Sequence, residues 1–183
     1  MGMELGKTLH VDNRQEWRDW LAKNNGRAKD IWLVFYRKAS GKISISYDDA
    51  IEEALCYGWI DSQVKNVDID SYAQRFTPRR AGSPISEMNK VRVLRLMEQG
   101  LMTPIGLAAL GDISAVFQAP DDILRELRKD PLVWENFQGF TETYRNIRVA
   151  FVEGARNRPA EFERRLRHLI KMTAQNKQFG MVR

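Results

Sequence analysis

Arginines, serines and an aromatic ring are concentrated between residues 59 and 89, and these residue types suit the binding of an anion. The string RFTPRR at residues 75–80 carries three guanidinium groups, and Ser83 follows in a polar loop. Arginine presents a planar set of N–H donors that matches a carboxylate or a phosphate in two-point contact. Pro78 would end a strand and stiffen the loop that presents Arg79 and Arg80. The segment therefore predicts a cationic binding surface.

Neighbouring positions supply further groups for such a surface. Trp59 could stack on a flat ligand, and Asp61 could pair with an arginine of the string. A helix that starts at Ser86 would add free backbone amides. The candidate ligand-binding residues are Trp59, Asp61, Arg75, Arg79, Arg80, Ser83, Ser86 and Asn89. The structural alternative is a buried bridge in which Asp61 pairs with Arg75 or Arg79, with the indole in the core.

No catalytic or metal-binding constellation is evident in the sequence. The two histidines, His10 and His168, lie near opposite ends of the chain, and neither has the spacing of a metal-ligand motif. Cys56 falls inside a predicted helix and suits a buried structural thiol. Acidic residues at 48, 49, 52 and 53 suit the first turns of that helix, where the helix dipole favours negative charge. We predict no catalytic residue, no metal site and no cofactor.

Hydrophobic patterns predict the elements that would position these residues. Residues 31–37 (IWLVFYR) are rich in β-branched and aromatic side chains and predict a buried strand, onto which residues 43–45 could pair back. Strands at about 59–65 and 72–77 predict a hairpin. Gly58 suits the left-handed backbone at the end of the preceding helix. Helices are predicted to begin after Asp12, Ser46, Ser86 and Thr103, residues that commonly cap helix N-termini.

The pattern after residue 120 is helical only. Residues 111–120 form the best candidate linker, and helices are predicted from Asp121 or Asp122 and over about 133–139, 141–156 and 159–174. Strands that occur in hairpins, rather than alternating with helices, favour an antiparallel sheet. We therefore predict an α+β fold, with a small antiparallel sheet and helices followed by an all-helical C-terminal domain. The predicted domains are residues 1–115 and residues 120–183.

Composition and charge restrict the class of protein. The chain has 183 residues, 43% hydrophobic and 29% charged, and no apolar run is long enough to span a membrane. The net charge is +5, and residues 141–183 carry ten Lys/Arg against four Asp/Glu. Such a tail suits an acidic partner or a nucleic acid, although no nucleic-acid-binding motif is present. The single cysteine and the lack of a secretory signal pattern favour the cytoplasm.

Two strings, EEALCYGWID at residues 52–61 and RFTPRR, together with shorter matches such as Asp130-Pro131, resemble a known bacterial family. This is the YdeI/OmdA-like family, also described as bacteriocin-protection or OmpD-associated proteins, and the resemblance covers residues 9–178. Ile85 stands where a Trp is expected, and residues 156–165 depart from the pattern of the tail. The resemblance implies the architecture and a link to envelope stress or antimicrobial-peptide resistance. It implies no reaction, cofactor or catalytic residue.

Three functional hypotheses follow from the sequence. We favour a non-enzymatic binding protein, associated with stress or antimicrobial resistance, that accepts a small anionic ligand or an acidic protein partner in the Arg/Trp cleft. The first alternative is an enzyme of unknown reaction that uses the same cleft, with Asp61 as its titratable group. The second is a nucleic-acid-binding protein that uses the basic C-terminal helices. The sequence leaves the oligomeric state open.

Overall fold

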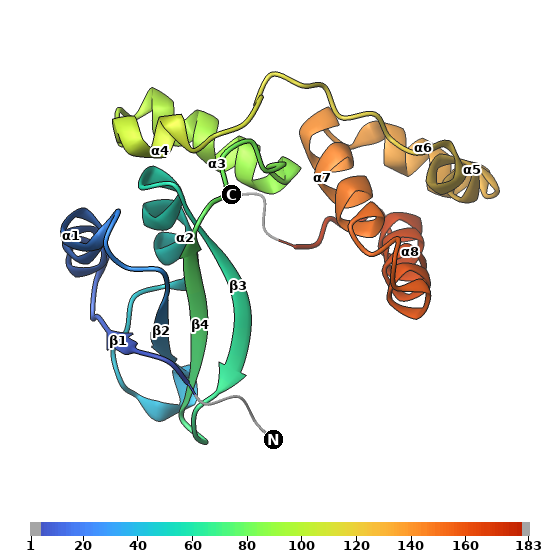
Figure 1. The fold of residues 1–183 in the computed structure, drawn as a ribbon. Coiled ribbons are helices and arrows are strands. Elements are labelled where there is room, and N and C mark those ends of the chain that lie inside the picture. Colours follow the sequence, from blue (N-terminus) through green and yellow to red (C-terminus); the bar gives the residue numbers. More distant parts are fainter. Residues whose placement is uncertain (1–4, 181–183) are drawn as a thin grey trace. The chain divides into compact units, whose positions relative to one another are not determined.

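We describe residues 5–180 in a computed structural model, in which the chain divides into two compact units (Figure 1). The first unit comprises residues 1–85 and 91–113, and the second comprises residues 86–90 and 114–183. Residues 1–4 and 181–183 lie outside the described part of the chain. The prediction of a cytoplasmic location used the N-terminal segment to which residues 1–4 belong. The α+β fold class is confirmed, because the strands lie in the first unit and the later part is helical.

The first unit is built on a mixed sheet with the strand order β1-β2-β4-β3. The strands are β1 (Thr8–His10), β2 (Ile31–Tyr36), β3 (Trp59–Asn66) and β4 (Ser71–Pro78). Strand β4 pairs in an antiparallel manner with β2 and with β3, so the predicted hairpin is confirmed. The sheet is not wholly antiparallel as predicted, because β1 pairs with β2 in parallel. Residues 43–45 were expected to pair with the strand at 31–37, but they form no strand. Strand β1 was not predicted, because its three residues are too few to show an alternating pattern.

Capping side chains begin the helices of the first unit. These are α1 (Arg14–Asn24), α2 (Tyr47–Cys56) and α4 (Pro104–Ala108), whereas a short 3-10 helix, η1 (Lys38–Ser40), has no side-chain cap. Ser46 and Thr103 accept the predicted capping hydrogen bonds from the backbones of Asp49 and Gly106. The cap of α1 is Asn13 rather than Asp12, because the Asn13 side chain accepts from the amide of Glu16. Helix α3 (Glu87–Glu98) begins in the second unit and continues in the first.

One face of the sheet forms the core of the first unit. Ile31, Leu33 and Phe35 alternate along β2, so their side chains point to the same side. They cluster with buried residues of α1 and α2, and with Trp59 and Phe76 of the hairpin. The helices α1 and α2 therefore cover this face, and the order of the strands places the end of β4 beside the start of β3.

The second unit is a group of helices with its own core. Its elements are α5 (Asp121–Arg128), α6 (Pro131–Gly139), α7 (Glu142–Glu153) and α8 (Pro159–Ala174), close to the predicted limits. Their buried core consists of Ile123, Leu127, Val133, Phe137, Val149, Val152 and Leu169. Among the described residues, no helix is long and apolar enough to cross a membrane.

Candidate functional site

The sheet register separates the predicted site residues instead of gathering them in one hollow. Asp61 pairs with Phe76, and Trp59 lies two residues before Asp61, so these side chains share the face that α1 and α2 cover. Arg75 precedes Phe76 in the same strand and therefore points to the opposite face. An indole at position 59 and a guanidinium at position 75 thus lie on different sides of the sheet.

Trp59 belongs to the hydrophobic core. Its side chain is fully buried, and its indole Nε1 donates a hydrogen bond to Asn25 Oδ1 at 3.4 Å. The ring of Trp20 meets it edge-on, with the ring centres 5.8 Å apart. Stacking on a ligand would require the indole to leave this packed position, so its predicted ligand role has no support in the geometry.

Asp61 and Arg75 each have a partner other than the one expected. Asp61 Oδ2 accepts hydrogen bonds from the Tyr47 hydroxyl at 2.9 Å and from Gln74 Nε2 at 3.3 Å. Burial and the negative charge of Asp61 raise the pKa of Tyr47, which stays a hydrogen-bond donor at neutral pH. The guanidinium of Arg75 pairs with Asp30, immediately before β2. The bridge that was predicted between Asp61 and an arginine is therefore wrong.

Arg79 differs from these residues because no carboxylate meets its charge within the described residues. Its side chain is 8% exposed. One terminal nitrogen, Nη2, donates to the carbonyl oxygens of Ser83 and Pro84, at 3.0 and 3.2 Å. The other two nitrogens, Nε and Nη1, are buried and have no hydrogen-bond partner. Burial lowers the pKa of this guanidinium, because the low-dielectric surroundings disfavour its charged form.

The backbone around Arg79 holds this side chain at the end of β4. The amide of Arg79 donates to the carbonyl of Gly58 at 2.8 Å, so the residue is fixed against the turn between α2 and β3. Gly58 has a positive φ of 71°, as predicted for that turn. Residues 80–82 are exposed and carry no regular secondary structure beyond a turn. A buried cation therefore lies beside an exposed segment that contains a second cation, Arg80.

Ser86 and Asn89 have a structural role at the start of α3. Ser86 Oγ accepts a hydrogen bond from the Asn89 amide at 3.3 Å, which confirms the predicted cap. Ser86 is exposed and Asn89 is buried, and both group with the second unit. The remaining candidates, Arg79, Arg80 and Ser83, group with the first unit. The predicted set therefore reduces to one local group, the segment from Arg79 to Ser83.

A network of acids and arginines on α1, α2 and α3 was missed at the sequence level. Glu53 is 2% exposed and accepts hydrogen bonds from Arg14 and from Arg18, the latter at 2.6 Å. Glu52 likewise meets Arg14 and Arg95. These acids were expected to act on the helix dipole, but their charges tie α2 to its neighbours. The signal in the sequence is that two charges follow Ala50-Ile51 and precede Ala54-Leu55, positions that a buried helix face would use.

No cluster of three or more His, Cys, Asp or Glu side chains suited to a metal ion occurs in residues 5–180. Comparison with protein families identifies both parts of the chain. Residues 9–109, more than half of the sequence, match the Domain of unknown function (DUF8412), and the chain belongs to this family. Residues 116–176 match the OmdA family, described as "Bacteriocin-protection, YdeI or OmpD-Associated", which confirms the resemblance there. No curated protein and no solved structure matches the chain.

Proposed function

We propose that this protein is a non-enzymatic binding protein, associated with stress or antimicrobial resistance, that accepts a small anion at Arg79. The observation behind the proposal is that Arg79 is buried with two unpartnered N–H groups and without a carboxylate partner in the described residues. The family description of residues 116–176 supports the link to bacteriocin protection. The single cysteine supports a reducing, cytoplasmic setting.

The argument for an anion is the free energy of an uncompensated charge. Transfer of a cation from water into a protein interior is costly unless an opposite charge or hydrogen bonds replace the water. Two carbonyl dipoles, those of Ser83 and Pro84, meet only one of the three nitrogens. A phosphate, sulfate or carboxylate has acceptor oxygens that could accept from the free Nε–H or from the free Nη1, which lie on different edges of the guanidinium. Binding at either position would supply a missing hydrogen bond and neutralise the charge.

Access to these nitrogens depends on the groups that cover them. The two free nitrogens are buried, so an anion reaches them only when neighbouring groups shift, and we assign this movement to residues 80–84. This segment suits such a movement, because residues 80–82 are exposed and belong to no helix or strand. Arg80 lies at the surface of the same segment and would attract an anion before it reaches Arg79.

The test is the thermal unfolding of the full chain with sodium phosphate or sulfate, against sodium chloride at equal ionic strength. A ligand that binds only the native state stabilises it by about 2.7 kcal/mol at a hundred times its Kd. We expect phosphate or sulfate to raise the Tm of the wild type. Arg79→Gln removes this response. Arg75→Gln keeps it and is the matched control, because Arg75 already has Asp30 as its partner.

A second measurement keeps the test independent of the Arg79→Gln variant, which also loses two hydrogen bonds to carbonyls. In the wild type, NMR of arginine Nε–H groups should show the Arg79 signal shift as phosphate is added. A response to an oligo-glutamate peptide alone would assign the site to an acidic protein partner. Equal responses of the wild type and Arg79→Gln, or no response to any anion, would overturn the proposal.

A further inference from the structure

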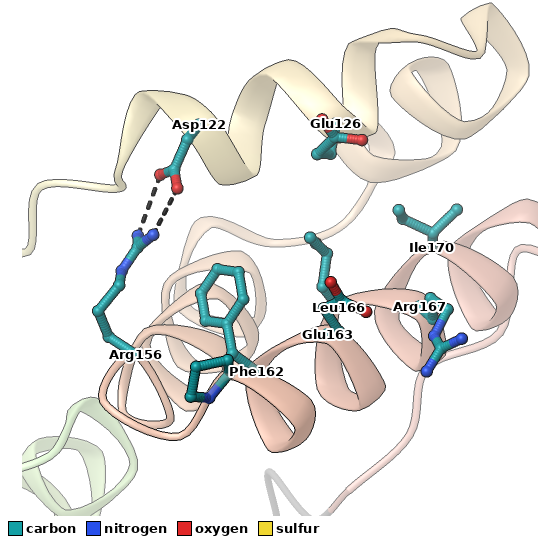
Figure 2. A pocket seen from close by; sticks show the side chains of 9 residues that line it. Asp122, Glu126, Arg156, Phe162, Glu163, Leu166, Arg167 and Ile170 are labelled. Atoms are coloured by element: carbon teal, nitrogen blue, oxygen red, sulfur yellow. Dashed lines mark hydrogen bonds and ion pairs between the residues drawn. The ribbon is translucent and has the colours of Figure 1, made fainter.

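A second site lies in the helical unit, remote in sequence from Arg79. A pocket of about 560 Å³ opens between α5, the turn after α7, and α8 (Figure 2). Its volume lies within the range of pockets that hold small molecules, about 300–1,000 Å³. All of its lining residues belong to the second unit, so the pocket is formed within one compact body.

The floor of this pocket is apolar. Phe162, Leu166 and Ile170 follow one another at intervals of four residues and therefore share one face of α8. Each is partly buried and packs against the core of the unit. In Figure 2 their side chains project from α8 toward α5. Because they stay partly exposed, they offer an apolar ligand a surface that water now covers.

One end of the pocket is closed by an ion pair whose charges are already matched. Arg156 donates to both carboxylate oxygens of Asp122, at 2.5 and 3.0 Å, and also to Glu153. The hydrogen bonds to Asp122 and Glu153 raise the pKa of Arg156. The hydrogen bond between Arg156 and Asp122 lowers the pKa of Asp122. All three guanidinium nitrogens are engaged, so neither charge is available to a ligand.

Two carboxylates and one guanidinium remain at the pocket, and one of the carboxylates, Glu126, is paired with Lys129. Glu163 projects from α8 and makes no hydrogen bond or ion pair within residues 5–180. Glu126 lines the pocket from α5, and only its Oε2 is engaged, by Lys129. Arg167 also lines the pocket, and it makes no ion pair within the described chain. Two carboxylates on facing helices thus border an apolar floor, although the C-terminal part of the chain has a positive net charge.

We propose that this pocket binds an amphiphilic cation, independently of the anion site at Arg79. The apolar body of the ligand lies on Phe162, Leu166 and Ile170, and its ammonium or guanidinium group lies between Glu126 and Glu163. Such a group is carried by free alkylamines and by the Lys or Arg side chains of amphipathic peptides. The chemistry of recognition is the same for both sources, and the experiment below separates them.

The test compares three probes of equal chain length on the full protein: n-octylammonium, octanoate and octan-1-ol. Methyl NMR of Leu166 and Ile170 reports binding at the floor directly. We expect n-octylammonium to bind roughly three- to tenfold more tightly than octan-1-ol, since two exposed ion pairs contribute modestly. The double variant Glu126→Gln with Glu163→Gln should remove this preference. Arg167→Gln is the matched control and should leave it or increase it.

A fourth probe identifies the source of the cation. A short amphipathic peptide of Lys and Leu, compared with its Glu and Leu counterpart, should bind more tightly than n-octylammonium if a peptide is the ligand. Weaker binding of the Lys peptide would assign the pocket to a free amine. Tighter binding of octanoate, with loss of binding in Arg167→Gln, would overturn the proposal. So would the absence of any shift at Leu166 and Ile170.

Discussion

The arginines of the first unit show that the position of carboxylates decides which of them can bind a ligand. Arg75 lies beside Asp30, and Arg14 and Arg18 lie beside the buried carboxylate of Glu53. In each case a charge is met inside the molecule. Arg79 meets only the dipoles of two carbonyl groups. The string RFTPRR therefore contains Arg75, which is held in a salt bridge, and Arg79, whose charge an external anion could neutralise.

The buried thiol of Cys56 gives a testable pH dependence at the residue scale. Burial, together with the negative charge of Glu53, raises the pKa of this thiol to about 11. The unfolded thiol has a pKa of about 8.5, so its contribution to stability is fully present below that pH and is lost as pH rises toward 11. The free energy of unfolding of the wild type should therefore fall relative to Cys56→Ala between these values, as measured by urea unfolding.

The comparison with Cys56→Ala cancels the other groups that titrate in the same alkaline range. Reaction of the native thiol with a disulfide reagent at pH 8 should also be slow, and unfolding should make it fast. A wild-type advantage over Cys56→Ala that stays constant from pH 8 to pH 11 would contradict the raised pKa. A native thiol that titrates near 8.5 would contradict it as well.

The residue types between positions 59 and 89 indicated the chemistry of the predicted site. The hydrogen-bond and ion-pair partners of these residues depend on the pairing of strands that are distant in sequence. Trp59 and Asp61 on one predicted strand were expected to share a cleft with Arg75 and Arg79 at the end of the neighbouring strand. Alternation along a strand shows which residues share a side, but not which side the helices will cover. The partner of Arg75 is Asp30, 45 residues earlier, and only the pairing of β2 with β4 brings the two together. No local pattern contains that information.

Local signals were reliable at the scale of elements, where capping and turn chemistry depend on a few neighbouring residues. Ser46, Thr103 and Gly58 have the predicted roles because a cap or a left-handed turn involves residues within four positions. Local signals did not predict β1, and they placed the cap of α1 one residue too early. A three-residue strand is defined by its partner rather than by its own sequence, and adjacent Asp and Asn are equally suited to capping.

The close approach of α4 to the end of α2 makes Gly106 a critical residue of this packing. A β-carbon at position 106 would lie 2.1 Å from the carbonyl oxygen of Cys56, which is backbone and cannot rotate away. Gly106→Ala should therefore push α4 outward and destabilise the protein by about 1–3 kcal/mol, the usual range for overpacking. Urea unfolding measures the change.

Gly139 provides the control for that substitution. It lies in the last turn of α6, and a β-carbon there would meet nothing within 4 Å. Gly139→Ala should be neutral or stabilise by up to about 1 kcal/mol, because alanine loses less backbone entropy in a helix. If Gly106→Ala proved as harmless as Gly139→Ala, the close contact between α4 and α2 would be wrong.

At the scale of the whole molecule, two family matches coincide with two separate hydrophobic cores. Residues 9–109 match one family and residues 116–176 match another. The core of the first unit is made by residues 11–96, and that of the second by residues 123–169. The anion site and the apolar pocket proposed above fall in different units. Each activity should therefore depend on its own part of the chain.

We propose that residues 1–115 and 120–183 are domains that fold independently, with residues 86–90 not needed by the second, and that residues 111–120, which form no helix or strand, join them. Limited proteolysis of the full chain should cut first in that segment, because unstructured exposed backbone fits a protease best. A fragment of residues 116–183 should keep its helical circular dichroism and unfold cooperatively. Its stability should be lower than that of a typical larger domain, because a core of this size supplies about 3–5 kcal/mol.

The decisive readout is the pocket at α5 and α8 rather than helicity alone. If the fragment is a domain, n-octylammonium should shift the methyl signals of Leu166 and Ile170 as it does in the full chain. The residues that line the pocket all lie within the fragment, so none of their contacts to one another is removed. A fragment that melts without cooperativity, or one that has lost these shifts while the full chain keeps them, would show that the helical part needs the first 115 residues to fold.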